Sequence, residues 1–253
     1  MGVDAAVADE PANWFARAAA PVEASERRKP VPPPPQPTQR SGPQPRPRFE
    51  AETGSRASAE AHAGASQAAS LDELRESLQA FDGCPLKATA KNLCFSRGSP
   101  SARLMLIGEG PGRDEDLQGK PFVGRAGQLL DKMLAAIDLG EDDVYIANIV
   151  YWRPPGNRTP TPQEVLACAP FLERQIELVD PDVLVFLGGA AAKQMFDTSE
   201  GIMRLRGKWR TLKAGGRERR ALATLHPAYL LRNPSAKRLA WRDLLEIGAA
   251  LDD

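Results

Sequence analysis

Short apolar runs that alternate with longer amphipathic stretches constrain the fold of this chain more than any other feature. The apolar runs, each of a length typical of a buried strand, span residues 104–107, 144–150, 183–187 and 221–225. The stretches with helical spacing span residues 125–136, 162–178, 190–196 and 236–250. Strands that alternate with helices predict a mostly parallel sheet, because a parallel pair needs a crossover connection. We therefore expect a three-layer α/β/α fold, in which helices cover both faces of a mostly parallel central sheet.

The first 68 residues differ from the rest in composition. They hold 11 of the 23 prolines, among them the run KPVPPPPQPTQR, and are otherwise mostly Ala, Ser, Gly and charged residues. Such a segment cannot bury enough apolar surface to offset the entropy that is lost on ordering. We expect residues 1–68 to be a disordered tail and residues 69–253 to form one folded domain. A capping box of Ser70 with Glu73 indicates where the first helix of that domain begins.

Charge, apolar runs and cysteine content indicate whether the chain spans a membrane, in which compartment it folds and what kind of partner it binds. The chain has 33 basic and 33 acidic side chains and three cysteines. It has no run of about 18 apolar residues, so no membrane span is expected. An odd number of cysteines without a close pairing pattern predicts reduced thiols in the cytoplasm. Basic side chains crowd residues 204–220 and 232–242, on either side of His226. Such stretches are more often solvated surface than phosphate contacts, but the pair suits a nucleic-acid partner.

The segment RLMLIGEGPGRDEDLQGKPFVG, residues 103–124, contains a predicted binding loop. Its apolar run ends in glycines at 108, 110 and 112, which let the chain turn sharply and let a ligand approach the backbone. Binding sites in open α/β sheets lie at the carboxyl ends of strands, where this loop would sit. Pro111 and Arg113 break the spacing of the dinucleotide fingerprint GxGxxG. The loop therefore predicts a site and leaves its ligand open.

Polar residues also mark the ends of two other predicted strands. Asn148 interrupts the apolar run VYIANIV, either as an amide satisfied inside the sheet or as a group aimed at a ligand. The stretch YWRPPGNRTPTP that follows is held stiff and extended by its prolines. His226 stands at the end of the last strand, directly before a proline. A lone histidine is more often structural than functional, so His226 is a candidate and no more on this ground.

Taken together, these motifs resemble the uracil-DNA glycosylase superfamily, and most of all its family 4. The matching segments, all between residues 84 and 247, are GEGPGRDED, GKPFVGRAGQLL, the strand asparagine, RPPGNRTPTP and HPAYLLR. Each motif alone is weak, but their shared order and spacing are specific. The resemblance implies a monomeric, cytoplasmic, nucleoid-associated DNA repair enzyme. It would flip uracil out of DNA and hydrolyse the N-glycosidic bond, leaving an abasic site.

The resemblance also implies a role for individual residues. Phe122 would stack on the flipped base, while Asn148 would bind its Watson–Crick edge. The substrate-binding set is completed by Glu109, Gly110 and Glu115. His226 would donate to O2 of the leaving uracil.

Many superfamily members carry a water-activating Asp where this chain has Gly110, so water positioning falls to Asn157 first and Glu109 second. Leu230 would enter the space that the base vacates. The arginines expected on DNA are Arg232, Arg158, Arg153 and Arg206.

A cofactor is the main departure from the resemblance. Family 4 proteins typically bind a [4Fe–4S] cluster through four cysteines, of which Cys84 and Cys168 match two. Phe81 and Trp152 occupy the other two positions, and Cys94 lies at the wrong place in the motif. Because two thiolates cannot hold a cluster that takes four ligands, we expect no cofactor and no metal.

Other functions remain compatible with the sequence. A glycosylase for another deaminated base, such as xanthine or hypoxanthine, would keep this scaffold, and so would a noncatalytic protein that binds uracil-containing DNA. A relative that traps DNA covalently uses an additional histidine, which the segment RLRGKWR lacks. For the tail, Trp14 and Phe15 either bind a repair or replication partner or are an apolar patch without one.

Overall fold

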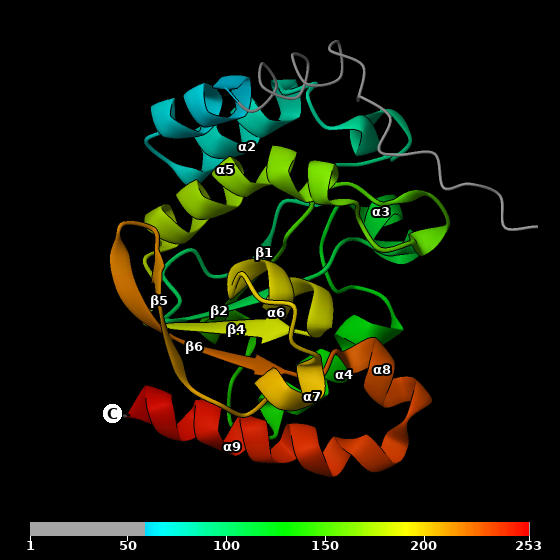
Figure 1. The fold of residues 1–253 in the computed structure, drawn as a ribbon, viewed down its shortest axis with the longest axis vertical. Coiled ribbons are helices and arrows are strands. Elements are labelled where there is room, and N and C mark those ends of the chain that lie inside the picture. The colour runs from blue at the N-terminus through cyan, green and yellow to red at the C-terminus, as the bar shows by residue number, and fades with distance from the viewer. Residues whose placement is uncertain (1–58, 253) are drawn as a thin grey trace, which may run out of the picture. The chain divides into compact units, whose positions relative to one another are not determined.

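A six-stranded sheet forms the centre of the protein (Figure 1). The structure is a computed structural model that describes residues 59–252. The strands are β1 (Arg97–Gly98), β2 (Leu104–Gly108), β3 (Val144–Asn148), β4 (Val183–Leu187), β5 (Arg210–Ala214) and β6 (Arg217–Thr224). Their order is β1-β3-β2-β4-β6-β5, with the four inner strands parallel and the two edge strands antiparallel. The expectation of a mostly parallel sheet is confirmed.

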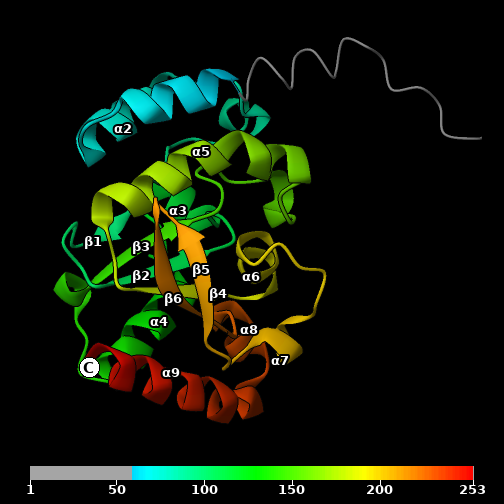
Figure 2. The same cartoon turned by 60° about the vertical axis from the view of Figure 1, so that its left-hand side comes forward.

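Helices cover both faces of this sheet, which makes the predicted three layers (Figures 1 and 2). The helices are α2 (Leu71–Ala80), α3 (Arg113–Gln118), α4 (Arg125–Ala135), α5 (Pro162–Val179), α6 (Gly189–Met195), α7 (Ile202–Leu205), α8 (Pro227–Arg232) and α9 (Lys237–Asp252). Side chains of α2 and α5 share one core with Met105 and Ile107 of β2. Those of α4 and α9 share the other with Leu104 and Leu106. Successive residues of a strand point to opposite faces, so one apolar run supplies both cores. Among the described residues, no helix has the length and apolar character needed to cross a membrane.

The folded part begins earlier than the composition predicts. Residues 59–67 are helical, and Ala61, Ala65 and Ala68 are buried in the core that contains α2 and α5. The Arg174 guanidinium donates to the Ala68 carbonyl from two nitrogens, at 3.0 and 2.9 Å. The boundary at residue 68 is therefore too late by at least ten residues, because small alanines at helical spacing form an apolar face that composition does not reveal. Residues 1–58, with Trp14, Phe15 and the proline run, lie outside the described residues.

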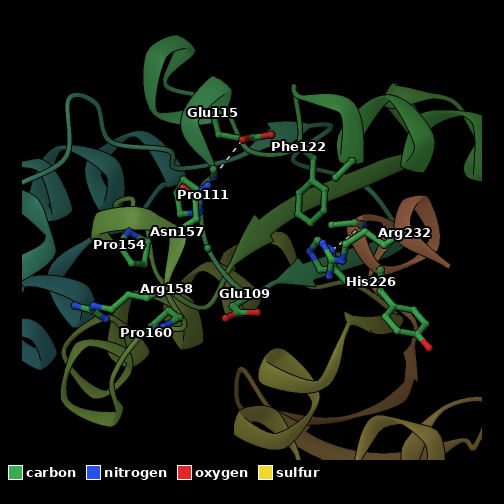
Figure 3. A pocket seen from close by; sticks show the side chains of 15 residues that line it. Glu109, Pro111, Glu115, Phe122, Pro154, Asn157, Arg158, Pro160, His226 and Arg232 are labelled. Carbon is green, nitrogen blue, oxygen red and sulfur yellow. Dashed lines mark hydrogen bonds between the residues drawn. The ribbon is translucent and has the colours of Figure 1, made fainter. Parts of the chain in front are cut away.

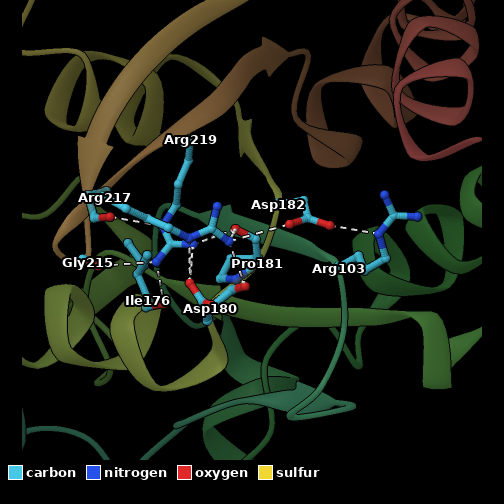
Figure 4. Close-up of polar contacts among 9 residues, drawn as sticks. Arg103, Ile176, Asp180, Pro181, Asp182, Gly215, Arg217 and Arg219 are labelled. Atoms are coloured by element: carbon cyan, nitrogen blue, oxygen red, sulfur yellow. Dashed lines mark hydrogen bonds and ion pairs between the residues drawn. The ribbon is translucent and has the colours of Figure 1, made fainter. Parts of the chain in front are cut away.

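Arginines of the basic segment 204–220 form ion pairs that stabilise the sheet (Figure 4). Arg217 and Arg219, near the start of β6, both bind the Asp180 carboxylate, at 2.6 and 2.8 Å. Arg103, just before β2, binds Asp182 at 2.7 Å. The Arg219 side chain is fully buried. These arginines lie at the amino ends of the strands, and their partners lie in the short connection between α5 and β4, far from them in sequence. The basic character of this stretch therefore does not by itself indicate a DNA-binding surface.

Candidate functional site

A cavity of about 380 Å³ opens at the carboxyl ends of the inner strands. Its walls are the segments 109–112 after β2, 154–160 after β3 and 226–232 after β6, together with Phe122. Figure 3 shows Phe122, His226 and Arg232 on one side, Pro154, Asn157 and Pro160 on the other, and Glu109 between them. β2 connects to β3 on one side and the neighbouring β4 connects toward β6 on the other, so the connections after β2 and β4 run in opposite directions. Open α/β sheets bind ligands at such a point.

Phe122 is held in the cavity wall by its own backbone and by two neighbouring segments. Its φ of 55° is a left-handed conformation that few side chains adopt. A Cβ at Gly127 in α4 would lie 1.6 Å from the Phe122 carbonyl oxygen, so the loop can pack there only on a glycine. The Glu115 carboxylate accepts from the backbone N–H of Gly124 at 2.9 Å and of Gly112 at 3.1 Å. Glu115 therefore ties the two loops that form this wall.

Asn148 lies behind the wall, at the end of β3. It is 1% exposed, and neither its Oδ1 nor its Nδ2 has a hydrogen-bond partner in the described part of the chain. A Cβ at Gly108 would come within 2.5 Å of both Asn148 Oδ1 and the Phe122 ring, so the amide and the ring edge meet across this glycine. A buried polar group without a partner costs about 1–3 kcal/mol. The amide is thus not satisfied inside the sheet, and its two polar atoms are free to bind a ligand.

His226 faces Phe122, with 5.6 Å between the ring centroids. Its Nδ1 accepts a hydrogen bond from the backbone N–H of Ala228 at 3.1 Å. Burial and the nearby positive charge of Arg232 lower the pKa of His226 to about 4. The imidazole is therefore neutral at pH 7, and because Nδ1 is an acceptor its one proton is on Nε2. Such a ring presents a fixed N–H donor.

The loop after β3 is braced by ion pairs and hydrogen bonds. Asn157 has a φ of 56°, and its Oδ1 accepts from Arg153 Nε at 2.7 Å. Arg158 binds the buried Glu164 carboxylate through two nitrogens, at 2.8 and 2.6 Å. That pair lowers the pKa of Glu164 below its usual range. Asn157 and Arg158 thus both line the cavity, but the Arg158 guanidinium is already paired.

Two residues that the sequence places on DNA are held away from the cavity. The Arg206 guanidinium binds the Asp243 carboxylate and donates to the Leu239 carbonyl at 2.6 Å. Leu230 is 1% exposed and packs in a core with Leu225 and Ala240. Neither residue lines the cavity. Leu230 is held away because its position on α8 turns its side chain toward the core. Arg206 is held away because it pairs with Asp243, a buried acid on α9.

Residues that line the cavity but were not singled out from the sequence include Tyr229. It lies three residues after His226 and three before Arg232, and all three line the cavity. Residues three apart on a helix share a face. This spacing in HPAYLLR is the sequence signal that identifies Tyr229, once His226 is known to face the cavity.

The donor set for an iron–sulfur cluster is incomplete. Cys84 and Cys168 are buried with their Sγ atoms 3.8 Å apart, and the Cys168 thiol donates to Cys84. This hydrogen bond and burial raise the pKa of Cys168. Phe81 and Trp152 are 8% and 3% exposed and belong to the same core. Within residues 59–252, no three His, Cys, Asp or Glu side chains are grouped so that they could hold a metal. The residues present do not fit a cluster with four thiolate ligands.

Comparisons with known proteins agree with this geometry. The model of the uracil DNA glycosylase superfamily matches residues 95–245. The type-4 uracil-DNA glycosylase of Archaeoglobus fulgidus is 40% identical over 183 residues, which cover 71% of this chain and 92% of that protein. The Thermotoga maritima type-4 enzyme is 41% identical over 180 residues, 69% of this chain and 91% of that protein. The chain therefore belongs to the uracil-DNA glycosylase superfamily, where it is similar to these type-4 members over about nine-tenths of their length.

Proposed function

We propose that this protein is a monofunctional uracil-DNA glycosylase of base excision repair. It hydrolyses the N-glycosidic bond of a uracil flipped out of DNA and leaves an abasic site. The observation that carries the proposal is the buried Asn148 amide, whose two polar atoms have no partner in the described chain and which meets the Phe122 ring. The similar proteins of Archaeoglobus fulgidus and Thermotoga maritima are named as uracil-DNA glycosylases, which supports the same activity.

Asn148 selects the base by hydrogen bonding. Its Oδ1 accepts from N3–H of uracil and its Nδ2 donates to O4, which satisfies both atoms of the amide. Cytosine presents an acceptor and a donor in the reverse order, so it would leave buried polar groups unpaired. Phe122 stacks on the base, and the backbone at Glu109 and Gly110 holds its carbonyl oxygens.

His226 stabilises the leaving group. When the bond between C1′ and N1 breaks, its electron pair goes to the base, so the sugar gains oxocarbenium character and uracil becomes an anion. The neutral His226 donates from Nε2 to O2 of that anion, without transferring a proton in the same step. Water then adds to C1′ and loses a proton to solvent.

Asn157 positions the attacking water, with Glu109 as the second group. Asn157 lies in the cavity wall, and its amide oxygen is fixed by Arg153 at 2.7 Å. At Gly110, where other members of the superfamily carry an acid, a Cβ would lie 2.8 Å from a methyl carbon of Val150. A side chain at this position would need the Val150 side chain to move. Because neither Asn157 nor Glu109 is a strong base, the reaction is dissociative and water capture is easy.

We further infer that the protein works as a monomer without a cluster, in the cytoplasm on nucleoid DNA, with Arg232, Arg153 and Arg158 at the DNA. In place of two cluster cysteines, Phe81 and Trp152 fill the space with apolar side chains. The tail would bind a repair or replication partner. Anaerobic purification tests the cofactor: we expect a colourless protein with little iron, and a brown sample with about four irons per chain would overturn this inference.

The activity is tested by the release of free base from labelled oligonucleotides. We expect release of uracil from a uracil-containing strand and no release of cytosine. Parallel substrates with hypoxanthine or xanthine give the specificity. Binding of uracil-containing DNA without release of any base would contradict the proposed function.

A further inference from the structure

Extruding a base leaves a gap in the DNA stack, and a side chain of the protein must fill it or the neighbouring bases lose their contacts. The sequence suggests Leu230 for this task. In the structure, Leu230 is 1% exposed and is packed against Leu225 and Ala240. To reach DNA it would have to leave that core and expose its apolar side chain to water, which is unfavourable. Leu230 is therefore a core residue, and the filling side chain must be another.

The faces of α8 identify a different residue. His226, which caps α8, is followed at three-residue intervals by Tyr229 and Arg232, and these three line the cavity. Tyr229 is 39% exposed, the largest exposed apolar side chain of this helix. Leu231 is similarly exposed, at 37%, but does not line the cavity. Only Tyr229 therefore combines an exposed ring with a place at the cavity wall.

The backbone that carries Tyr229 is fixed at both ends of α8. His226 caps its start, and Pro227 occupies the first helical position. At its other end, the Tyr229 carbonyl accepts from the backbone N–H of Asn233 at 2.8 Å and from its side-chain amide at 3.1 Å. The ring is thus presented from a rigid turn, one helical turn away from the imidazole that would contact the flipped base.

We propose that Tyr229 fills the gap in the duplex from which uracil has been extruded, by stacking its ring on an adjacent base. Arg232, one turn further along α8, is exposed and would contact a phosphate next to that gap. This inference rests on the proposed function, and it names the residue that holds the extruded state of a duplex substrate open. Stacking of a base on an aromatic side chain changes binding by roughly tenfold to a hundredfold on alanine substitution.

The test compares duplex and single-stranded substrates under single-turnover conditions. Tyr229→Ala should slow excision from a U:G duplex by about tenfold to a hundredfold and leave excision from a single strand within about threefold of wild type, because no stack has to be opened there. Tyr229→Phe should retain the duplex rate. Leu231→Ala, which removes a neighbour of equal exposure, is the matched control and should behave as wild type on both substrates.

A second substrate separates gap filling from a structural effect. A pyrene nucleotide opposite the uracil fills the gap from the other strand, so it should restore the rate of Tyr229→Ala. Equal losses on both substrates, no rescue by pyrene, or a larger loss for Leu231→Ala would each overturn the assignment. If the wild-type protein releases no uracil even from a single strand, the proposed function itself fails, and that outcome is distinguishable from the others.

Discussion

At the scale of residues, the side chains of the site differ in how many of their polar atoms have a hydrogen-bond partner. His226 has one nitrogen satisfied by the Ala228 backbone and the other available. Asn148 has neither polar atom satisfied within the described chain. By contrast, Gln175, an equally buried amide, accepts from the Tyr151 hydroxyl at 3.0 Å and donates to the Tyr145 hydroxyl at 2.7 Å. A buried amide with both polar atoms paired and a buried amide with neither paired in the described chain can therefore be compared in one protein.

Replacing Asn148 should separate stability from activity. In Asn148→Leu, an unsatisfied buried amide becomes a side chain of similar size without polar atoms. We expect the free energy of unfolding to stay equal or to rise by about 1 kcal/mol, while release of uracil is lost. Gln175→Leu is the matched control: it removes the partner of the buried Tyr151 hydroxyl and one of the partners of the Tyr145 hydroxyl, and should destabilise by about 1–3 kcal/mol. Denaturant unfolding measures both variants. A clear destabilisation of Asn148→Leu would mean that the amide has a partner in the folded protein.

The low pKa of His226 predicts a pH dependence of stability. In the unfolded chain this histidine takes up a proton below pH 6.5, whereas in the folded protein it does so only near pH 4. The unfolded state thus binds more protons between these values, so stability falls as pH decreases through this window. From pH 7 to pH 5 the loss in the free energy of unfolding is about 2 kcal/mol, and it should be absent from His226→Ala. Urea unfolding of both proteins at pH 7 and pH 5 measures this difference.

His226→Ala should also lose about two to three orders of magnitude in the rate of uracil release. The release assay measures this rate, and a smaller loss would contradict the role of His226 at the leaving group.

At the scale of elements, a strand can be predicted from the sequence when both of its faces are buried, because nearly all of its residues are then apolar. β4 was expected at residues 183–187, where the structure places Val183–Leu187, because both of its faces are covered and nearly every residue is apolar. β5 was missed, because this edge strand has only Leu212 and Ala214 as apolar residues and exposes Thr211 and Lys213 between its less exposed positions. The helix at residues 59–67 was missed for a related reason, since its buried face consists of small alanines.

Truncation should reveal the extra element at the amino end. Deleting residues 1–58 should leave the melting temperature unchanged. Deleting residues 1–68 removes the buried Ala61, Ala65 and Ala68 together with the carbonyl that Arg174 binds. At about 0.8 kcal/mol for each buried methyl group, we expect a loss of about 2 kcal/mol. Equal stability of the two truncated proteins, measured by thermal unfolding, would refute the structural role of this segment.

At the scale of the whole molecule, some basic residues are paired inside the fold and others, such as Arg232, line the cavity, and the sequence does not show which are which. Arg219 and its partner Asp180 lie 39 residues apart in the chain, and Arg206 and Asp243 lie 37 apart. A count of nearby charges does not detect such partners. The segments after β2, β3 and β6, in contrast, line one cavity, because the carboxyl ends of parallel strands lie at one edge of the sheet.

Two arginine variants should therefore fail in different ways. Arg232→Ala should weaken DNA binding and reduce the slope of log affinity against log salt by about one, as expected for the loss of one phosphate contact. Arg206→Ala should leave that slope unchanged and instead destabilise the fold by about 3–5 kcal/mol, because Asp243 would stay buried without its cation. A reduced salt slope for Arg206→Ala in a folded protein would restore it to the DNA surface.

The contact of Phe122 with Gly127 bears on the affinity of the site. The strained backbone of Phe122 is set by α4, which packs against its carbonyl oxygen before any base arrives. A ring that is already immobilised loses little conformational entropy when a base stacks on it. More of the stacking energy then remains as affinity, so the conformational cost of binding has been met during folding of the protein and does not recur with each damaged base.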